Sequence, residues 1–259
     1  MRNLKLTLAY DGTRFVGWQR QSEGESIQGV LEEALARFEG APVTVHGAGR
    51  TDAGVHAIGQ VASASVGFTH PPETIRRALN AQLPEDIRVV DVADAAPDFH
   101  ARFSARSKTY RYQLRAGSVG DPFTRAFTWQ LPESLDVAAI QTAAAALVGA
   151  YDFAAFQSIG TEVSSTIRTI FRSAFCELEP PPSPSGPGLP GSGHLLIYEV
   201  TADGFLRHMV RAIVGTLVEI GRGWRPVDSM AQLLEGGTRA QGGATAPPHG
   251  LFLVRVHYA

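Results

Sequence analysis

The sequence predicts a mixed α/β (α+β) fold built from two similar domains, each a mixed sheet with its helices on one side. Three observations lead to this prediction. Short stretches in which apolar and polar residues alternate occur in both halves of the 259-residue chain, as expected of half-buried strands. Stretches with apolar residues at helical spacing lie between them. In the first half the order is β-α-β-β-α-β, which is typical of a mixed sheet covered by helices on one side.

The first half opens with a strand over residues 4–8, where three leucines alternate with polar residues. A helix follows over 26–38, with Ser26 as a candidate N-cap and Gly40 at the end of the helical spacing. The other expected elements are strands over 43–46, 59–66 and 87–92 and a helix over 72–79.

The second half has a similar order of elements without a sequence repeat. Its expected elements are strands over 109–115, 168–178, 195–201 and 251–257, and helices over 135–147, 204–220 and 227–234. The connection 179–193 holds six prolines and four glycines, so we expect an inserted, mobile hairpin loop there. We place the domain boundary near Ser104, which gives an N-terminal domain 1–104 and a C-terminal domain 105–259.

Composition limits the class of protein. The N-terminus alternates in polarity instead of forming the apolar core of a signal peptide. The chain has no uninterrupted apolar run of about 18 residues, so a membrane span is not expected. Cys176 is the only cysteine, which excludes an intrachain disulfide. We therefore expect a cytoplasmic protein.

The charge pattern leaves two interpretations open. The net charge of −2 argues weakly against a nucleic-acid partner. However, only two of the 23 basic residues are lysines, and the planar arginine side chain suits phosphate and stacks on bases. Residues 102–115 carry five cations and no acid. This basic stripe is either an RNA-binding surface or an ordinary solvated face, and charge alone favours neither.

Residues 46–57, HGAGRTDAGVHA, form the most unusual stretch, with three glycines around Arg50 and Asp52. Glycines permit positive φ and close backbone approach, so this loop could lie against a ligand. It lacks the Gly-Lys-Ser/Thr of a phosphate-binding loop. It also lacks the ligand spacing of a metal site, so no metal is expected. The alternative is an Asx-turn, in which Asp52 bonds its own backbone and Arg50 points to water.

Residues 203–221, DGFLRHMVRAIVGTLVEIG, are apolar almost all round from Met209 onward, which predicts a buried helix. Arg207 and Arg211 are four residues apart and would share one face of it. A buried guanidinium needs a carboxylate or phosphate partner. Arg211 therefore meets either a structural acid or Asp52, whose pKa it would lower. The sequence does not decide between these partners.

Residues 107–114, SKTYRYQL, predict a strand on which Lys108, Tyr110, Tyr112 and Leu114 share one face. Alternating tyrosines are most often core residues. A tyrosine beside a basic stripe also suits a flipped base that stacks on an aromatic ring.

Six stretches carry a resemblance to a known family and span nearly the whole chain. In chain order they are AYDGTRFVGWQRQ, GAGRTDAGVHAIGQV, NAQLPEDIRV, FHARFSARSKTYRY, GFLRHMVRAIVGTL and APPHGLFLVRVHY. They resemble the tRNA pseudouridine synthase A family, and the second stretch is the most specific of the six. Two departures stand out: Tyr151-Asp152-Phe153 where the family commonly has His-Asp-Phe, and the insertion 179–193.

The resemblance implies an enzyme that isomerises uridine to pseudouridine at positions 38, 39 and 40 of the tRNA anticodon stem-loop. It implies the pseudouridine synthase fold with an active-site cleft between the domains, and no metal or organic cofactor. It also implies a homodimer with tRNA lying across a cleft that both subunits share.

The resemblance also implies roles for four residues of this sequence. Asp52 would be the catalytic aspartate and Arg211 its basic partner, Arg50 would displace the target base, and Tyr110 would stack on it. Phosphate contacts would then position the tRNA. The candidates for these contacts are Arg14, Arg20, Arg102, Arg106, Lys108 and Arg111. We expect structural roles for Phe15, Trp18, His46, His56 and His208.

The chemistry is consistent with this assignment, because the reaction moves the same ribose carbon from N1 to C5 of the same base. Nothing is oxidised and no net atom is added, so one carboxylate can suffice. Asp52 could attack C1′, attack C6, or remove a ribose proton. One rival interpretation is a non-catalytic RNA-binding module, which leaves the Asp52 loop without a purpose. Another is a glycoside or nucleoside hydrolase, which normally requires a pair of carboxylates.

Overall fold

The computed structural model describes residues 1–117, 120–158, 160, 163–178 and 193–259. The chain forms two compact units, Met1–Lys108 with Phe252–Ala259 (unit 1), and Thr109–Leu251 (unit 2). The division after Lys108 lies four residues beyond the expected boundary at Ser104. The last eight residues belong to unit 1 because Phe252 and Leu253 pair with the strand that begins at His56. Each unit is described by itself.

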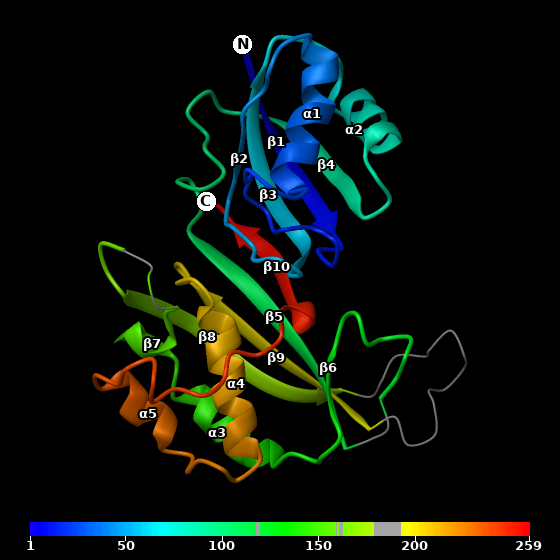
Figure 1. The fold of residues 1–259 in the computed structure, drawn as a ribbon. Coiled ribbons are helices and arrows are strands. Elements are labelled where there is room, and N and C mark those ends of the chain that lie inside the picture. The colour runs from blue at the N-terminus through cyan, green and yellow to red at the C-terminus, as the bar shows by residue number, and fades with distance from the viewer. Residues whose placement is uncertain (118–119, 159, 161–162, 179–192) are drawn as a thin grey trace. The chain divides into compact units, whose positions relative to one another are not determined.

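Unit 1 is a mixed sheet with both of its helices on one side (Figure 1). Its strands are β1 (Arg2–Tyr10), β2 (Val45–Gly47), β3 (His56–Val66), β4 (Ile87–Ala95) and β10 (Leu251–His257). The order is β4-β1-β3-β10, with β2 also paired to β3. β1 is antiparallel to β3 and β4, whereas β10 is parallel to β3. The helices are α1 (Ile27–Glu39) and α2 (Pro72–Gln82).

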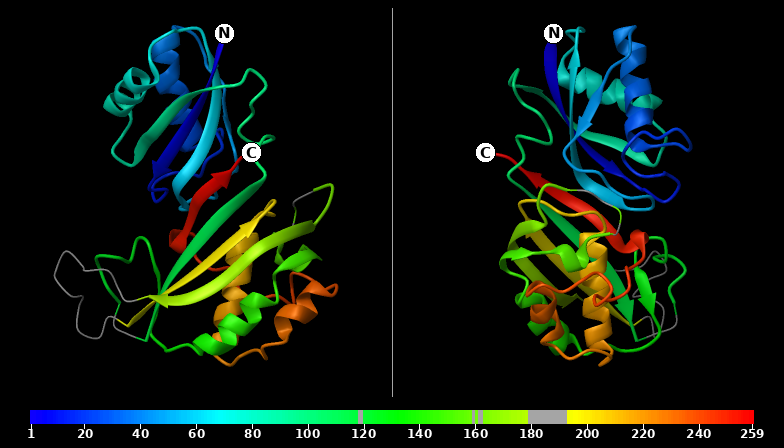
Figure 2. Two further views of the ribbon diagram at one scale, coloured as in Figure 1. Left: turned by 180° about the vertical axis from the view of Figure 1, so that it is seen from behind. Right: turned by 60° about the vertical axis from the view of Figure 1, so that its left-hand side comes forward.

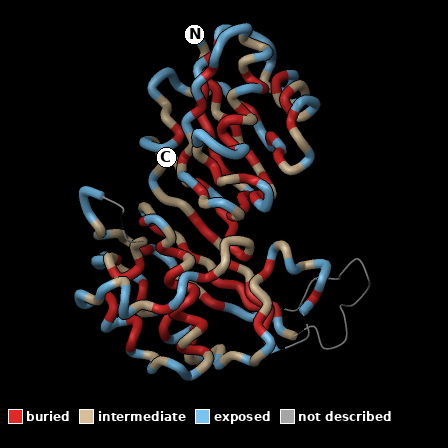
Figure 3. The backbone as a smooth tube through the Cα atoms, in the orientation of Figure 1, coloured by how far each residue is buried: buried red, intermediate tan, exposed pale blue. Residues whose placement is uncertain are grey.

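The core of unit 1 follows from the alternation in β1. The three leucines of this strand are each 0% exposed, as the sequence predicts (Figure 3). Burying one such side chain contributes roughly 1.5–3 kcal/mol. Helix α1 begins where Ser26 accepts a hydrogen bond from the Gly29 N–H, and it ends at Gly40, whose φ is 73°. Both helix signals read from the sequence are confirmed.

The helix-free face of the unit 1 sheet is covered by residues 96–106, the segment between β4 and β5 (Figure 1). The Asn3 side-chain amide donates to the carbonyl oxygens of Ala96 and Phe99, at 2.9 and 2.8 Å. The Ala101 N–H donates to Ser63 Oγ at 3.1 Å, and the Tyr258 hydroxyl donates to the Ala101 carbonyl at 2.7 Å. This segment has no helix or strand of its own, yet side chains from two strands and the C-terminus hold it.

Unit 2 also has its helices on one face of a mixed sheet, as the views in Figures 1 and 2 agree. The strand order is β5 (Ser107–Ala116), β9 (His194–Ala202), β8 (Ile167–Leu178) and β7 (Gly149–Asp152), with β6 (Trp129–Leu131) parallel to β5. The helices are α3 (Val137–Ala145), α4 (Met209–Gly221), α5 (Ser229–Leu234) and the 3-10 turns η1 (Ala154–Phe156) and η2 (Pro248–Gly250). The expected mixed α/β fold with helices on one side is therefore confirmed in both units.

Helix α4 differs from the prediction at its start. The helix was expected from residue 204, but it begins at Met209, because His208 adopts a left-handed conformation with φ 62°. The His208 ring nitrogen Nδ1 lies 2.9 Å from Ser158 Oγ, which holds this residue in place. Arg207 therefore lies before the helix, and the prediction that it shares a helix face with Arg211 is wrong. From Met209 onward only Arg211 and Glu219 are not fully buried, so the predicted buried helix is confirmed.

Strands β6 and β7 were not expected, because three and four residues are too few to show an alternating pattern. β7 contains Tyr151, which departs from the family pattern and is 39% exposed beside the buried Phe153. The predicted insertion lies outside the described residues except for Gly193. No helix within the described ranges is long and apolar enough to cross a membrane.

Candidate functional site

The glycine-rich loop in unit 1 is closed by its own backbone. The Val55 N–H donates to the Asp52 carbonyl oxygen at 3.1 Å, and Gly54 adopts φ 75° within this turn. Before the turn, the Ala48 N–H donates to the Val61 carbonyl at 2.8 Å and ties the loop to β3. The main-chain hydrogen bond from Val55 to Asp52 thus closes the turn.

A buried network of polar side chains supports this loop. The Tyr10 hydroxyl lies 2.8 Å from Thr51 Oγ1. The Gln60 amide donates to the Tyr10 hydroxyl at 3.3 Å and to the Gly49 carbonyl at 2.8 Å. Burial raises the pKa of Tyr10 to about 12, so its hydroxyl stays protonated and bonded at neutral pH. Because a buried polar group costs free energy when its partner is lost, this network holds the backbone on either side of Arg50.

A second loop, residues 11–18, packs backbone to backbone against the first. The Trp18 N–H donates to the Thr51 carbonyl at 3.0 Å. A Cβ at Gly12 would lie 2.0 Å from the Val55 carbonyl oxygen, and one at Gly17 would lie 2.6 Å from the Thr51 oxygen. Gly17 also has φ 109°. Only glycine allows this approach, which brings the AYDGTRFVGW stretch against the Asp52 loop.

The structural roles expected for several residues of these loops are confirmed. Phe15 and Trp18 are each 2% exposed. His56 is 1% exposed, and its Nδ1 accepts a hydrogen bond from the Gly12 N–H at 3.1 Å. The His56 ring also stacks on Phe252, with 4.8 Å between the ring centroids.

Arg50 and Asp52 lie at the outer side of this supported loop. Arg50 is exposed, and its Nε donates to Gln19 Oε1 at 3.0 Å. Asp52 is half-buried, whereas Thr51 between them is buried. The residue between the cation and the carboxylate is thus anchored in the core through its hydroxyl contact with Tyr10.

Tyr110 lies on β5 in unit 2 and is 7% exposed. Its ring meets Phe205 edge to face, with 4.9 Å between the centroids and 79° between the planes. Such a contact fixes the orientation of both rings. The neighbouring Tyr112 is fully buried, which agrees with the expectation that the two tyrosines share one face of the strand.

Arg211 lies in the first turn of α4 and is clamped by residues 244–250. Its Nε donates to the Ala246 carbonyl at 2.7 Å, and the Ala246 N–H donates to the Arg211 carbonyl at 3.1 Å. A Cβ at Gly215 would lie 1.6 Å from the Ala244 carbonyl oxygen, so the segment runs directly against the helix. The Tyr112 hydroxyl donates to the Pro247 carbonyl at 2.8 Å and holds the same segment from the sheet side.

The charge of Arg211 acts on two neighbouring groups of unit 2. Burial raises the pKa of Tyr112 far above its ordinary value, and the Arg211 charge partly opposes this. Burial lowers the pKa of His249, and the Arg211 charge lowers it further. Tyr112 and His249 thus remain neutral at pH 7, and the guanidinium is the cation of this cluster.

Comparison with known proteins identifies the family. A family model described as tRNA pseudouridine synthase matches residues 7–104 and 143–259. The chain is similar to proteins named tRNA pseudouridine synthase A from Citrifermentans bemidjiense (42% identical), Moorella thermoacetica (44%) and Myxococcus xanthus (44%). These matches cover 100%, 98% and 100% of this chain and 98%, 99% and 92% of the relatives, respectively.

The chain belongs to the tRNA pseudouridine synthase family. The enzyme is an isomerase, and the rival interpretation as a non-catalytic RNA-binding module has no support. The matched stretches include the loop with Arg50 and Asp52 and the helix with Arg211. Tyr110 lies between them, within the full-length similarity to the relatives.

The six candidate phosphate contacts of the synthase differ in ion pairing and in exposure. Arg14 pairs with Asp86 and Glu25, Arg20 with Glu32, and Arg111 with Glu199. Acids of the chain therefore already balance the charge of these three. Arg102 and Arg106 are exposed, and within the described residues neither makes an ion pair. Lys108 is half-buried at the start of β5.

Some residues that build the synthase's loops were not singled out from the sequence. Gln60 and Tyr10 hold the Asp52 loop, and Ala246 with Pro247 clamps Arg211. All four lie within the stretches that carry the family resemblance. The sequence does not show which distant residues bond to one another, since the partners of a buried glutamine are seen only in the folded chain.

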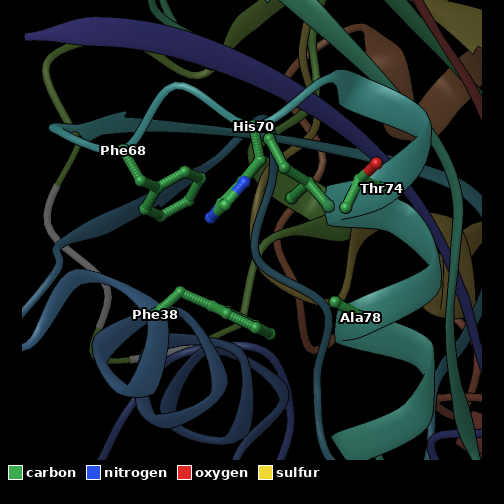
Figure 4. A pocket seen from close by; sticks show the side chains of 6 residues that line it. Phe38, Phe68, His70, Thr74 and Ala78 are labelled. Atoms are coloured by element: carbon green, nitrogen blue, oxygen red, sulfur yellow. The ribbon is translucent and has the colours of Figure 1, made fainter.

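A small cavity of about 100 Å³ lies apart from these loops, on the helical side of unit 1 (Figure 4). Phe38 of α1 and Thr74 and Ala78 of α2 line it, together with Phe68 and His70 from the segment before α2. None of these residues was expected at the active site, and the lining offers no carboxylate for the reaction. Among the residues that the structure describes, no cluster of three or more His, Cys, Asp or Glu could hold a metal.

Proposed function

We propose that this synthase converts uridine to pseudouridine at positions 38, 39 and 40 of the tRNA anticodon stem-loop, with Asp52 as its catalytic carboxylate. The observation that carries the proposal is the loop that presents Asp52. Its backbone is fixed by a buried network and by glycine contacts, while Arg50 is exposed and Asp52 is half-buried. Full-length similarity to proteins named tRNA pseudouridine synthase A supports the substrate.

A fixed loop suits this chemistry. The C1′–N1 bond of the target uridine breaks, the uracil turns over, and C1′ bonds to C5 of the same base, while the C5 proton leaves and N1 takes up a proton. One carboxylate can act as nucleophile or base in this sequence. Its position must be held before the substrate arrives, because misplacing a reacting group by about 1 Å can cost a factor of roughly 100 in rate.

Arg50 and Tyr110 are proposed to handle the flipped base. The target uridine must leave its stack, which costs a few kcal/mol. The exposed guanidinium of Arg50 has the length to fill the vacated position. Tyr110, whose ring meets Phe205 edge to face, is proposed to support the extruded uracil by stacking.

Arg211 is proposed as the cation that keeps the Asp52 carboxylate ionised during the reaction. Its Nε donates to the Ala246 carbonyl oxygen, and a guanidinium carries five N–H donors in a planar fork, so this contact is compatible with a bond to a carboxylate. A half-buried guanidinium held in this way stabilises an ionised carboxylate more than a solvated guanidinium does.

Binding and assembly complete the proposal. Arg102 and Arg106 are the preferred phosphate contacts, and Arg14, Arg20, Lys108 and Arg111 are secondary ones. We propose that the synthase works in the cytoplasm as a homodimer, with the tRNA lying across a cleft that both subunits share.

The test is to incubate the purified enzyme with unmodified tRNA transcripts and to map pseudouridine along each product. The proposal expects pseudouridine at positions 38, 39 and 40 wherever a uridine occurs there. Matched transcripts with cytidine at these positions should remain unmodified. Modification only in another arm of the tRNA would contradict the proposed sites, and no modification of any transcript would contradict the activity.

A further inference from the structure

Three aromatic rings lie against one another on the helix-free side of unit 1, and none of them has a role in the proposed reaction. The His46 and His100 rings lie 4.8 Å apart, and the His100 and Phe103 rings lie 4.4 Å apart, between centroids. His46 comes from β2, whereas His100 and Phe103 come from the segment 96–106. We call these three residues the ring stack.

The outer end of the ring stack is open. Phe103 is 76% exposed, although a phenyl ring in water lacks the apolar contacts that would stabilise it. His100, in the middle, is half-buried, and its ring plane is tilted by 32° to that of His46 and by 39° to that of Phe103. The stack therefore ends in a ring that can accept one more flat group.

The segment that carries the open ring is rigidly held. The Arg102 N–H donates to His100 Nδ1 at 3.1 Å, and the His100 N–H donates to Ser104 Oγ at 3.0 Å. Hydrogen bonds from Asn3 and Tyr258 and to Ser63 fix the same segment on the sheet. A platform fixed before binding loses little conformational entropy when a ligand stacks on it.

The charge around the open ring favours a nucleic acid as its partner. The Arg102 guanidinium carbon lies 5.6 Å from the centre of the Phe103 ring, and the segment 96–106 carries two arginines, Arg102 and Arg106, and one acid, Asp98. Arg102 and Arg106 are exposed beside it. Aromatic rings flanked by cations are the usual way in which proteins hold unpaired bases, the ring stacking on the base and the cations meeting its phosphates.

The position of the ring stack links it to the substrate. His46 is the middle residue of β2, which leads at Gly47 directly into the loop with Asp52. Both belong to unit 1. A tRNA engaged with the Asp52 loop would therefore extend over the same unit that carries the stack.

We propose that Phe103, at the open end of the ring stack, stacks on an unpaired base of the tRNA other than the target uridine. This base contact would add affinity and orientation without taking part in the chemistry. The inference rests on the proposed function, in that it takes tRNA to be the substrate.

The experiment measures the Kd of an unmodified tRNA transcript for the wild type, Phe103→Ala, Phe103→Leu and Phe103→Tyr. Loss of one stacked base weakens binding by about 5- to 150-fold, so we expect this range for Phe103→Ala. Phe103→Tyr should bind as the wild type does, and Phe103→Leu should bind as weakly as alanine. Phe123→Ala removes a ring that is 58% exposed in unit 2 and serves as the matched control, expected to leave Kd unchanged.

Salt dependence separates stacking from charge. The slope of log Kd against log salt concentration reports the number of phosphates neutralised, at about 0.7–0.9 per contact. Phe103→Ala should weaken binding with the slope unchanged, whereas Arg102→Ala should reduce the slope by about one contact. The KM for tRNA should rise in Phe103→Ala while kcat stays within about twofold of the wild type.

Three results would overturn the proposal. In the first, Phe103→Ala binds tRNA as the wild type does. In the second, Phe103→Leu retains full affinity, which would mean that apolar contact and not stacking holds the tRNA. Phe103→Ala could instead change the oligomeric state by light scattering, which would assign the ring to a contact between copies of the chain. A wild-type enzyme that binds tRNA but does not modify it would contradict the proposed function, while the Kd series would still judge the ring stack.

Discussion

At the scale of single residues, the site consists of reactive side chains whose neighbours hold the backbone. Thr51, between Arg50 and Asp52, is buried and bonded to Tyr10. The sequence revealed the outward residues because glycines surround them. It did not reveal the supporting contacts, since Gln60 and Tyr10 lie 50 residues apart along the chain.

Arg211 shows the same limit of prediction from sequence. An arginine in an otherwise apolar helix was recognisable from the sequence, whereas the Ala246 carbonyl that holds its Nε was not. The companion role expected for Arg207 failed because the left-handed His208 starts the helix later. The backbone conformation of His208 therefore decides that Arg211 lies in the helix and Arg207 before it.

We predict that Arg211→Met lowers kcat by roughly 10²–10³-fold, the usual cost of removing one fixed electrostatic partner from a reacting charge. The Kd for tRNA should change little, since the side chain acts on the carboxylate. Tritium release from tRNA labelled at C5 of uridine measures kcat. Adding Arg211→Met to an Asp52→Ala enzyme should cause no further loss, because residues that act as a unit are not additive. A variant with full activity would remove Arg211 from this role.

At the scale of elements, the fold was readable where the pattern repeats over several residues. β1, α1 and β10 were predicted from alternation, capping and apolar content, and the structure has them within a few residues. β6 and β7 were not predictable, because three or four residues carry no period. The segment 96–106 could not be placed either, since hydrogen bonds to distant side chains fix it without helix or strand.

The contact between loops 11–18 and 47–55 leads to a prediction about two glycines. Gly17 has φ 109° and lies against the Thr51 carbonyl, whereas Gly40 has φ 73° with open space around it. Gly40→Ala should cost about 1 kcal/mol of stability, the strain of a left-handed alanine, and leave kcat unchanged. Gly17→Ala should cost about 2 kcal/mol or more and also lower kcat, because it displaces the backbone beside Asp52.

Urea unfolding and C5-tritium release together measure this difference. If Gly17→Ala retained wild-type kcat in its folded fraction, the loop contact would be structural only. Equal loss of activity in Gly40→Ala would point to general destabilisation instead.

At the scale of the whole molecule, two histidines in different units make stability depend on pH. Burial lowers the pKa of His100 below 6.5, helped by the charges of His46 and Arg102, and burial lowers the pKa of His249 likewise. As the pH falls, the unfolded chain therefore takes up protons at these two histidines at a higher pH than the folded chain does. Their contribution to stability is complete above about pH 6.5 and is lost as the pH falls through 6.5 toward the folded-state pKa.

We predict that the urea midpoint of the wild type falls between pH 7.5 and pH 5.5. His100→Gln and His249→Gln should each show a smaller fall over this range, because each removes one group that prefers to stay neutral when folded. His70→Gln, at an exposed position, serves as the control and should fall as the wild type does. Identical falls in all four proteins would show that other groups carry the pH dependence.

The account depends most on Asp52 as the catalytic carboxylate, and tritium release from C5-labelled tRNA by Asp52→Ala tests it directly. We predict that Asp52→Ala binds tRNA with wild-type affinity and loses tritium release by a factor on the order of 10³ or more. Release at the wild-type rate from a folded Asp52→Ala enzyme would contradict the account.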